Sequence, residues 1–541
     1  MNQSTKQEQR RLFLKQISIC VAGTGMMQFI PANVFAGAPM RHGLPRSTPE
    51  AQGISSADIM HFVETAEKSN AGLHSFMVIR HGHVVAEGWW SPYNANIAHC
   101  LYSLSKNFTS TAIGLAIQEG KLNLADKVVS FFPDDKPAST DGNLSAMTIR
   151  DLLTMTSGHE ADTFWPMMSS KDGNWVKTYF SIPVKFSPGS HFTYNSGNSY
   201  MLSAIITKVM GESMLNYLQP RLFAPLGIKD AAWDTDPRGI NIAAAGLRLK
   251  TEDIAKFGQL YLQKGMWNGK RILNEKWVEE ATSFKVRNDE TGTPTKTEDD
   301  DIKQGYGYHF WMSRPVAQGA YRAEGAFCQY SIVMPAQDAV IAITAEGVST
   351  HRVMDLCWNL LLPAMKPGVL PANKFSNKIL KDKLAGLRLV APKSKPVSPL
   401  SASLSGKQFY MESNSMNVQN ITFDFKEKET LFKLKTEKSV FEISCGIEDW
   451  ILGKTSMPGS PTNVLFGSPL FKSEWKVAAS GTWKDDNTFI MIWRFFETPH
   501  SDIVTCKFDK DKLEIDYSNS VSRIINTYKD QRPVLKGKQK S

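Results

Sequence analysis

The segment on which the fold assignment depends reads LYSLSKNFTSTAIGLAIQEG over residues 101–120. After Lys106 its apolar side chains, beginning with Phe108, recur at helical spacing until Gly120 ends the pattern. Ser103 therefore lies at or just before the N-terminus of a helix. A step of three residues places Lys106 on the same face one turn later, with its amine near the Ser103 hydroxyl.

This pair of side chains can supply half of a nucleophilic site. A serine hydroxyl is a weak nucleophile until a neighbouring base takes its proton, and the attacked carbonyl needs aligned N–H donors for its oxygen. The N-terminus of a helix provides N–H groups without helical partners and favours negative charge. We therefore predict that Ser103 is a nucleophile and that Lys106 helps to move its proton.

The Ser-x-x-Lys spacing alone is weak evidence, because ordinary residue frequencies give about two chance copies in a chain of 541 residues. Ser473 and Lys476 have the same spacing. They lie among strand candidates, where a three-residue step puts the two side chains on opposite faces. We interpret this second copy as a coincidence.

The order of the expected elements on both sides of residues 101–120 predicts an α+β fold. In this fold, one antiparallel sheet flanked by helices is interrupted by a large helical insertion. A pair of β-rich runs stands on each side of the helical part, and His81-Gly82 is a hairpin signal in the first pair. The acidic stretch over 285–304 has no core-forming period, so we expect a surface loop there. The expected elements are a helix over 57–68, strands over 75–80 and 83–87, a mostly helical region over 103–281, strands over 329–334 and 339–345, and a helix over 350–362.

The C-terminal part has a different residue pattern. Residues 390–407 are rich in Pro, Ser and Lys and hold little that could be buried, which predicts a linker. Beyond them, closely spaced strand candidates predict an all-β barrel or sandwich of roughly 130 residues. We expect a first domain over 40–385, a linker over 386–407 and a β-rich domain over 408–530. The strand candidates cover 418–425, 430–435, 440–444, 476–483, 489–496, 503–508 and 512–517.

The first 36 residues have the features of an export signal. Arg10-Arg11 precedes Leu12-Phe13-Leu14-Lys15 and a mild apolar run, and Val34-Phe35-Ala36 is a small-residue cleavage site. We expect a twin-arginine signal peptide over 1–36, cleaved after Ala36, and a periplasmic or secreted protein. No later run approaches the roughly 18 apolar residues of a membrane span, so we expect no stable span.

The composition of the chain indicates a soluble protein without a nucleic-acid partner. Hydrophobic residues make up 42% of the chain and charged residues 21%, as in a soluble globular protein. The formal net charge of +9 is modest for this length, and the basic run over 536–540 has no interleaved aromatic residues, so we expect a solvated tail and no nucleic-acid partner. Five of the six cysteines remain after the signal, at irregular spacings, so a disulfide framework is not expected, although Cys445 and Cys506 could pair.

Several stretches, in chain order, resemble segments of the serine β-lactamase-like hydrolases, a family that includes class C β-lactamases, penicillin-binding proteins and 6-aminohexanoate-dimer hydrolases. The segment around Ser103 resembles the active-site helix of that family, and residues 152–159 resemble another of its segments. Tyr194, in Phe192-Thr193-Tyr194-Asn195-Ser196-Gly197, falls at the place of the family's tyrosine motif. Ala323-Glu324-Gly325-Ala326 takes the place of the motif on the strand that lines the site.

The resemblance implies a role for these motifs. Tyr194 would share proton transfer with Lys106, as phenol or as a phenolate whose pKa is lowered by the ammonium, and which of the two is the base stays open. A buried structural role for Tyr194 is the alternative. The backbone N–H groups of Ser103 and Ala326 would form the oxyanion hole, and Gly325 would let the backbone approach the substrate closely.

Two departures from the family bear on the substrate. β-Lactamases of this type carry Asn where this chain has Ser196, and Lys where it has Ala323. Loss of that cation removes a charge-assisted contact worth about 1.5–3 kcal/mol. Ser196 and Gly325 would instead bind a small-molecule or peptide-like acyl substrate, as in the esterase and amidase branch. We expect the neighbouring Glu324 to face solvent.

The residues together predict a serine hydrolase that acts through an acyl-enzyme on an ester or amide bond, with no metal or other cofactor. Two alternatives stay open: a β-lactamase or D-amino-acid peptidase, and a non-catalytic periplasmic module that binds peptidoglycan. The intact set of Ser103, Lys106 and Tyr194 argues against the second alternative.

Other residues of chemical interest have simpler interpretations. His99, four residues before the nucleophile, is expected to be structural, although it could line the site. His81 and His83 flank a turn glycine and are expected to form a polar turn rather than a metal site. Trp89-Trp90 could form a lip that stacks on substrate, but packing against the helical region is the simpler expectation.

Overall fold

The computed structural model describes residues 43–137, 142–288, 300–347, 349–395, 397–461, 474–524 and 528–539. The expected signal peptide over 1–36 lies outside these residues. Within the described ranges, no helix combines the length and hydropathy that crossing a membrane requires.

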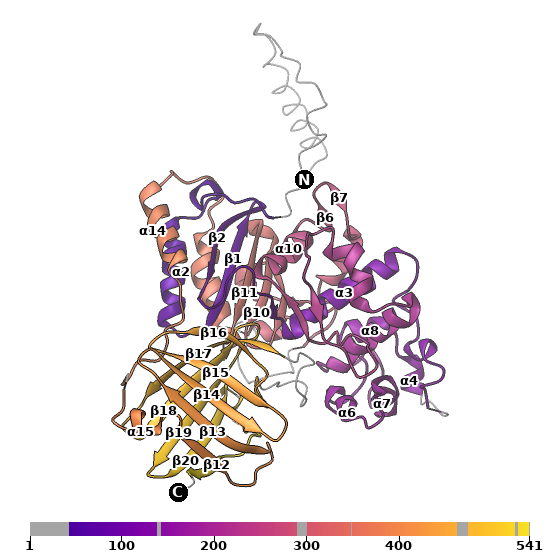
Figure 1. The fold of residues 1–541 in the computed structure, drawn as a ribbon. Helices are drawn as coiled ribbons and strands as arrows, with labels where there is room; N and C mark the ends of the chain where they lie inside the picture. Colours follow the sequence, from indigo (N-terminus) through magenta and orange to yellow (C-terminus); the bar gives the residue numbers. More distant parts are fainter. Residues whose placement is uncertain are drawn as a thin grey trace, which may run out of the picture. The chain divides into compact units, whose positions relative to one another are not determined.

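A six-stranded antiparallel sheet organises the first part of the chain, with the strand order β2-β1-β11-β10-β9-β8 (Figure 1). Both expected hairpins are confirmed, and the helical segments enter between β2 and β8, as the sequence predicts. The strands are β1 Leu73–Arg80, β2 His83–Trp89, β8 Trp311–Met312, β9 Tyr321–Gly325, β10 Gln329–Met334 and β11 Ala339–Ala345.

The alternation of side chains in β1 divides this domain into two apolar layers. All eight residues of β1 are buried. Met77 and Ile79 point into the cluster shared with the helical insertion, whereas Phe76 and Val78 point into the cluster on the other face. That other face is covered by α2 Ser56–Lys68, α12 Thr350–Leu356 and α14 Lys374–Ala385 (Figure 1).

The helical insertion surrounds three long helices, α3 Ser105–Gln118, α8 Ser196–Met210 and α10 Thr251–Leu262. Gly258 lets α10 approach the sheet, because a Cβ there would lie 2.6 Å from Val340 Cγ1. The shorter helices are α4 Gly142–Ala146, α5 Ile149–Leu153, α6 Phe164–Met168, α7 Trp175–Ser181, α9 Met214–Leu218 and α11 Glu275–Ala281. Short strands form two small sheets, β3 His99–Cys100, β4 Ala232–Trp233 and β5 Leu247–Leu249, and β6 Met266–Trp267 with β7 Lys270–Arg271.

Two expectations for the first domain are wrong in part. The helix over 350–362 is interrupted by a π turn, Cys357–Leu361, before α13 Leu362–Ala364. The acidic stretch over 285–304, whose centre lies outside the described residues, is not simply a surface loop at its C-terminal end. Asp301 is fully buried and accepts hydrogen bonds from Trp358 Nε1 at 3.1 Å, while Arg314 Nε lies 2.9 Å from it.

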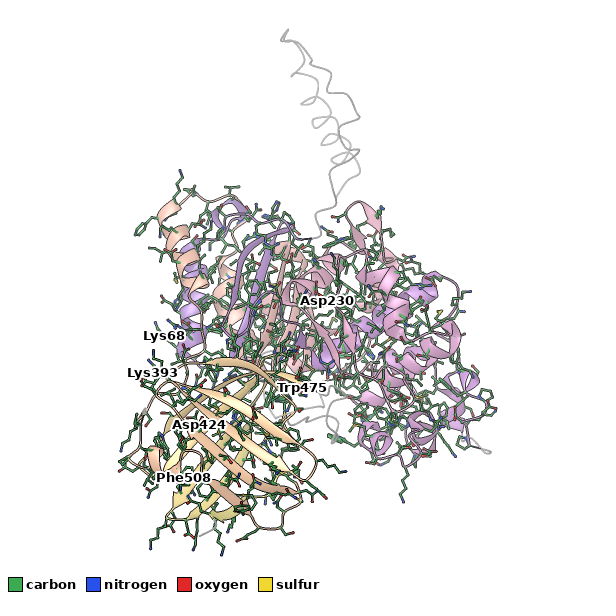
Figure 2. The ribbon with its side chains drawn as sticks, in the orientation of Figure 1. Lys68, Asp230, Lys393, Asp424, Trp475 and Phe508 are labelled. Atoms are coloured by element: carbon green, nitrogen blue, oxygen red, sulfur yellow. The ribbon has the colours of Figure 1, made fainter. Side chains whose placement is uncertain are left out.

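The C-terminal part is a β-barrel (Figure 1), closed by a circuit of nine strands among the residues that the structure describes. The circuit runs β15-β14-β13-β12-β21-β20-β19-β18-β17 and closes where β17 pairs with β15 in parallel, with β16 added at the edge of β17. Its interior holds aromatic residues, among them Phe508, which is labelled in Figure 2. The strands are β12 Gln408–Met411, β13 Val418–Phe425, β14 Glu429–Thr436, β15 Val440–Ile447, β16 Ile451–Thr455, β17 Trp475–Trp483, β18 Thr488–Phe495, β19 His500–Asp509, β20 Lys512–Asn519 and β21 Leu535–Gln539.

The barrel corrects three sequence expectations and settles whether Cys445 and Cys506 pair. Its last strand is β21, so it continues past residue 530, and the expected solvated tail over 536–540 is mostly a strand that pairs with β12 and β20. Cys445 and Cys506 are buried free thiols and form no disulfide. The segment over 386–407 is not a bare linker, because Leu387 is buried and Leu389 accepts a hydrogen bond from Trp450 Nε1 at 2.9 Å.

The C-terminal end of β18 and the turn that leads to β19 make polar contacts with the sheet domain. Arg494 forms an ion pair with Glu346 at 2.6 Å, and the two side chains are 12% and 23% exposed. The Cys100 amide donates to the Glu497 carbonyl at 2.9 Å, and Tyr93 Oη donates to the Thr498 carbonyl at 3.2 Å. Residues 494–500 thus attach the barrel directly beside β3, which leads into the Ser103 segment.

Candidate active site

Ser103 lies in a 3₁₀ turn, Tyr102–Leu104, that runs directly into α3. The Nζ atom of Lys106, in the first turn of α3, lies 3.1 Å from Ser103 Oγ. The structure therefore confirms the helix-terminal position and the one-turn spacing that the sequence predicts. Ser103 is half-buried, whereas Lys106 is only 2% exposed.

The surroundings of Lys106 change its acid–base behaviour. Its Nζ donates to the Ala244 carbonyl at 2.9 Å and lies 3.4 Å from Ser196 Oγ. Burial lowers the pKa of Lys106 to about 7, because the charged form loses its hydration, while the charge of Asp162 opposes this shift. Near neutral pH a large fraction of Lys106 is a free amine, which can accept the Ser103 proton.

Tyr194 completes the group around the nucleophile. The centre of its ring lies 4.9 Å from Lys106 Nζ, and the Ser103 side chain acts on the pKa of Tyr194 in the direction opposite to burial. Burial raises the pKa of Tyr194 well above its usual value, and the charges of Glu324 and Asp162 add to the shift, so the expected lowering of this pKa is wrong. Tyr194 is a phenol at neutral pH and acts as a proton donor or relay more readily than as a base.

An aromatic wall holds Tyr194 in place. Its ring stacks on Trp311 with centroids 5.4 Å apart and meets Tyr306 edge-on at 6.3 Å. Neither Trp311 nor Tyr306 was identified from the sequence. The run Tyr306-Gly307-Tyr308-His309-Phe310-Trp311 is an unusual concentration of aromatic residues that could have indicated such a wall.

The start of α8 positions Ser196. Asn195 caps the helix, with its side chain accepting from the Gly197 amide at 2.9 Å and from the Thr163 hydroxyl at 2.9 Å. Asp162 accepts from the Ser196 amide at 2.9 Å, which places a carboxylate near Lys106. Sequence reasoning missed Asp162, because it lies in a loop with no recognisable motif.

The end of β9 packs directly on the nucleophile turn. A Cβ on Gly325 would lie 2.1 Å from the Leu101 carbonyl oxygen, so only glycine permits this approach. Ala326 follows at once and is exposed. Neither the Ser103 nor the Ala326 N–H donates a hydrogen bond to another group within the described residues. Both amides are therefore available to a substrate oxygen.

The position that carries Lys in the β-lactamases holds a buried Ala323, 1% exposed. Glu324 does not face solvent as expected. Its side chain is 15% exposed and forms an ion pair with the fully buried Arg322 at 2.7 Å. The end of β9 therefore carries a carboxylate that is paired with Arg322, and no lysine at this motif.

The remaining sequence candidates are structural. His99 Nε2 lies 3.1 Å from His74 Nδ1, in a buried pair away from Ser103. Trp89 Nε1 donates to Thr251 Oγ1, and Trp90 is buried in the core, so both pack rather than form a lip. His81 contacts Gln52 in the hairpin turn. No group of three or more metal-ligating side chains occurs among the residues that the structure describes.

Comparisons with known proteins identify the family of the chain. The family model described as Beta-lactamase matches residues 64–364, more than half of the 541 residues. A 6-aminohexanoate-dimer hydrolase from Paenarthrobacter ureafaciens is 27% identical over 221 residues, which cover 38% of this chain and 56% of that protein. A protein from Escherichia coli K12, provisionally named a D-alanyl-D-alanine carboxypeptidase, is 27% identical over 28% of this chain and 39% of its own length. The chain thus spans about half the length of these curated relatives.

Two solved structures are also similar. One, from Bacillus anthracis and provisionally named a 6-aminohexanoate-dimer hydrolase, has a TM-score of 0.49 at 21% identity and covers 61% of this chain and 89% of its own. The other, an octameric penicillin-binding protein homologue from Pyrococcus abyssi, has a TM-score of 0.45 at 14% identity and covers 89% of this chain and 99% of its own. The family assignment depends on the sequence model, whose match contains the nucleophile turn, α8 and β9. The chain belongs to the Beta-lactamase family.

Proposed function

We propose that this protein hydrolyses an ester or amide bond through an acyl-enzyme formed on Ser103. The observation that carries the proposal is the 3.1 Å separation of Ser103 Oγ from the buried Nζ of Lys106, whose pKa burial lowers to about 7. A lysine amine with this pKa is neutral often enough at pH 7 to act as a general base.

The reaction then has two halves. Lys106 takes the proton of Ser103 while Oγ attacks the carbonyl carbon, and the amides of Ser103 and Ala326 bind the oxyanion. Collapse expels the leaving alcohol or amine, which receives a proton from Lys106 through the Tyr194 hydroxyl. Water next attacks the acyl-enzyme, its proton passes to Lys106, and the carboxylic acid leaves as Ser103 regains its hydrogen.

An ester or open-chain amide suits the site better than a β-lactam. Ala323 removes the cation that would meet a β-lactam carboxylate, a contact worth about 1.5–3 kcal/mol. Ser196 offers a hydroxyl beside Lys106 and Tyr194 where β-lactamases of this type carry an amide. The relative named 6-aminohexanoate-dimer hydrolase supports an amide substrate. The alternatives are turnover of a β-lactam or a D-amino-acid peptide, and binding of peptidoglycan without turnover.

Replacing Ser103 tests the proposal. Ser103→Ala should abolish hydrolysis of p-nitrophenyl acetate and labelling by a fluorophosphonate, because the attacking oxygen is gone. Ser473→Ala, at the other Ser-x-x-Lys sequence, is the matched control and should leave both unchanged. Labelling that persists in Ser103→Ala would refute the assignment, and acylation without turnover would favour a binding module.

A panel of substrates distinguishes an esterase or amidase from a β-lactamase. Esters, short oligoamides, D-amino-acid amides and nitrocefin should be compared at equal concentration. We expect esters or oligoamides to give the highest kcat/KM. Rapid turnover of nitrocefin at low micromolar concentration would instead assign the protein to the β-lactamases.

We also propose that the protein is exported by the twin-arginine route. Arg10 and Arg11 at the N-terminus support this proposal. Conversion of both to Lys should retain the full-length precursor in the cytoplasm, as cell fractionation with an antibody would detect. Normal export of that variant would contradict it.

A further inference from the structure

Three aromatic rings meet where the barrel contacts the nucleophile turn. Tyr102 and Phe327 lie 5.2 Å apart, and both face His500, at 5.7 Å and 5.0 Å between ring centroids. The interplanar angles are 64°, 86° and 83°, so all three contacts are edge-to-face, the favoured arrangement for such rings. His500 is the first residue of β19 and belongs to the barrel, whereas the other two rings belong to the sheet domain.

Each of the two sheet-domain rings adjoins one amide of the oxyanion hole. Tyr102 directly precedes Ser103, and Phe327 directly follows Ala326. Both residues have left-handed backbones, with φ of 49° for Tyr102 and 65° for Phe327. Such conformations cost roughly 1–3 kcal/mol in non-glycine residues and persist only where surrounding contacts impose them. The orientation of both amides therefore depends on what holds these two rings.

His500 is the residue that holds them from the barrel side. Its Nε2 is hydrogen-bonded to the Tyr102 hydroxyl, and its Nδ1 lies 2.9 Å from Ser520 Oγ. Burial lowers the pKa of His500 to about 3 and raises the pKa of Tyr102, so both groups are neutral. The Tyr102 hydroxyl then donates to Nε2 and the Nδ1–H donates to Ser520, which fixes the tautomer and the ring plane.

The turn that carries His500 is itself fixed to the sheet domain. The Arg494–Glu346 ion pair and the hydrogen bond from the Cys100 amide to Glu497 lie within six residues of His500. His500 is therefore held relative to Ser103 by contacts on its own strand hairpin.

We propose that the C-terminal barrel contributes directly to catalysis, with His500 as a positioning residue that orients the Ser103 and Ala326 amides through Tyr102 and Phe327. This inference rests on the proposed function, since it concerns the same oxyanion hole. It gives the barrel a role that its strand sequence does not reveal. His500 contacts no substrate in this role, so its loss should lower kcat and leave KM almost unchanged.

The test compares His500→Ala, His500→Gln and Tyr102→Phe in the full-length protein. Removing an oxyanion donor costs about 10²–10³ in rate, and a misdirected donor should cost part of that, so we expect His500→Ala to lower kcat roughly 10- to 100-fold. Gln can accept from the Tyr102 hydroxyl with its amide oxygen at the place of Nε2, so His500→Gln should recover much of the loss. Phe508→Leu, in the barrel interior, is the control that lowers the unfolding temperature without changing kcat.

A double variant distinguishes positioning from general damage. If His500 and Tyr102 act through one hydrogen bond, His500→Ala with Tyr102→Phe should be no slower than the slower single variant. Multiplication of the two losses, or a kcat for folded His500→Ala within twofold of the wild type, would overturn the inference. Activity in Ser103→Ala would overturn the proposed function instead, so the two failures are distinguishable.

Discussion

At the scale of single residues, the balance between burial and charge sets the chemistry of the site. Lys106 is nearly inaccessible to solvent, and the charge of Asp162 only partly offsets the loss of hydration. Tyr194 is affected in the opposite sense, because its charged form is the anion. The opposite shifts suit the two groups to the different roles proposed for them, Lys106 as base and Tyr194 as donor.

The pH dependence of catalysis follows from Lys106. The base must be the neutral amine, so kcat/KM should rise with pH through about 7 and level off above it. Lys106→Arg should have a kcat/KM roughly 10²- to 10⁴-fold lower at every pH, because a guanidinium cannot give up its proton. Rates of a neutral ester between pH 5.5 and 9 measure both effects. A wild-type profile that is flat across this range would exclude Lys106 as the base.

Stability should depend on the same group. The folded protein holds Lys106 at a pKa near 7, below the value of about 10.5 in an unfolded chain, so the unfolded state binds more protons between these values. Wild-type stability should therefore rise relative to Lys106→Met as the pH increases from 7 to 10. Thermal unfolding of both proteins at pH 6, 8 and 10 checks this. An unfolding-temperature difference that stays constant would contradict the lowered pKa.

At the scale of elements, the site depends on close contact between the end of β9 and the turn before α3. Gly325 makes this contact possible, since the Leu101 carbonyl occupies the space of a side chain. The same contact brings Ala326 beside the nucleophile turn. The family resemblance places residues 323–326 on the strand that lines the site, but the sequence carries no information about which backbone lies above that strand.

Gly325→Ala should disturb the oxyanion hole. A Cβ 2.1 Å from the Leu101 oxygen forces β9 away from the turn, so we expect kcat to fall at least roughly tenfold and stability to fall by about 1–3 kcal/mol. Gly453→Ala in β16, where nothing lies within 4 Å of the new atom, is the matched control. Steady-state kinetics and chemical denaturation measure the two effects. Equal behaviour of the two variants would show that the close approach is unimportant.

At the scale of the whole chain from Gly43 onward, the sheet domain and the barrel belong to one unit. They have separate apolar cores, yet polar contacts from the end of β18 and from the turn that follows it connect them. The Arg494–Glu346 ion pair is the clearest of these contacts. Arg494 and the neighbouring His74 hold the pKa of Glu346 well below its usual value despite its burial.

Breaking this ion pair should cost stability. Arg494→Met leaves a largely buried carboxylate without its partner, so we expect a loss of about 2–4 kcal/mol, reduced in Arg494→Met with Glu346→Leu. Lys378→Met removes an exposed pair with Asp382 and should change stability by less than about 0.5 kcal/mol. Thermal unfolding at pH 7 compares them. Because the Glu346 pKa is depressed, the wild-type advantage should shrink as the pH falls below about 4.5.

The agreement between the strands predicted from the sequence and those of the structure varies within the barrel. Val418–Phe425 alternates polar and apolar residues and was predicted with its observed bounds. Leu535–Gln539 was missed, because its Lys and Gly residues resemble a solvated tail and only pairing with two neighbouring strands makes it a strand. The closure of the barrel likewise depends on β15 meeting β17, which no local pattern encodes.

The sequence by itself determined the position of the proposed nucleophile relative to Lys106. Ser103 and Lys106 are three residues apart in a 3₁₀ turn that runs into α3, so their proximity follows from local helical geometry. Only the tertiary structure decided the proton affinity of Lys106 and the contact between His500 and Tyr102. The first depends on how completely surrounding elements exclude water, and the second joins residues 398 positions apart, which no local periodicity can specify.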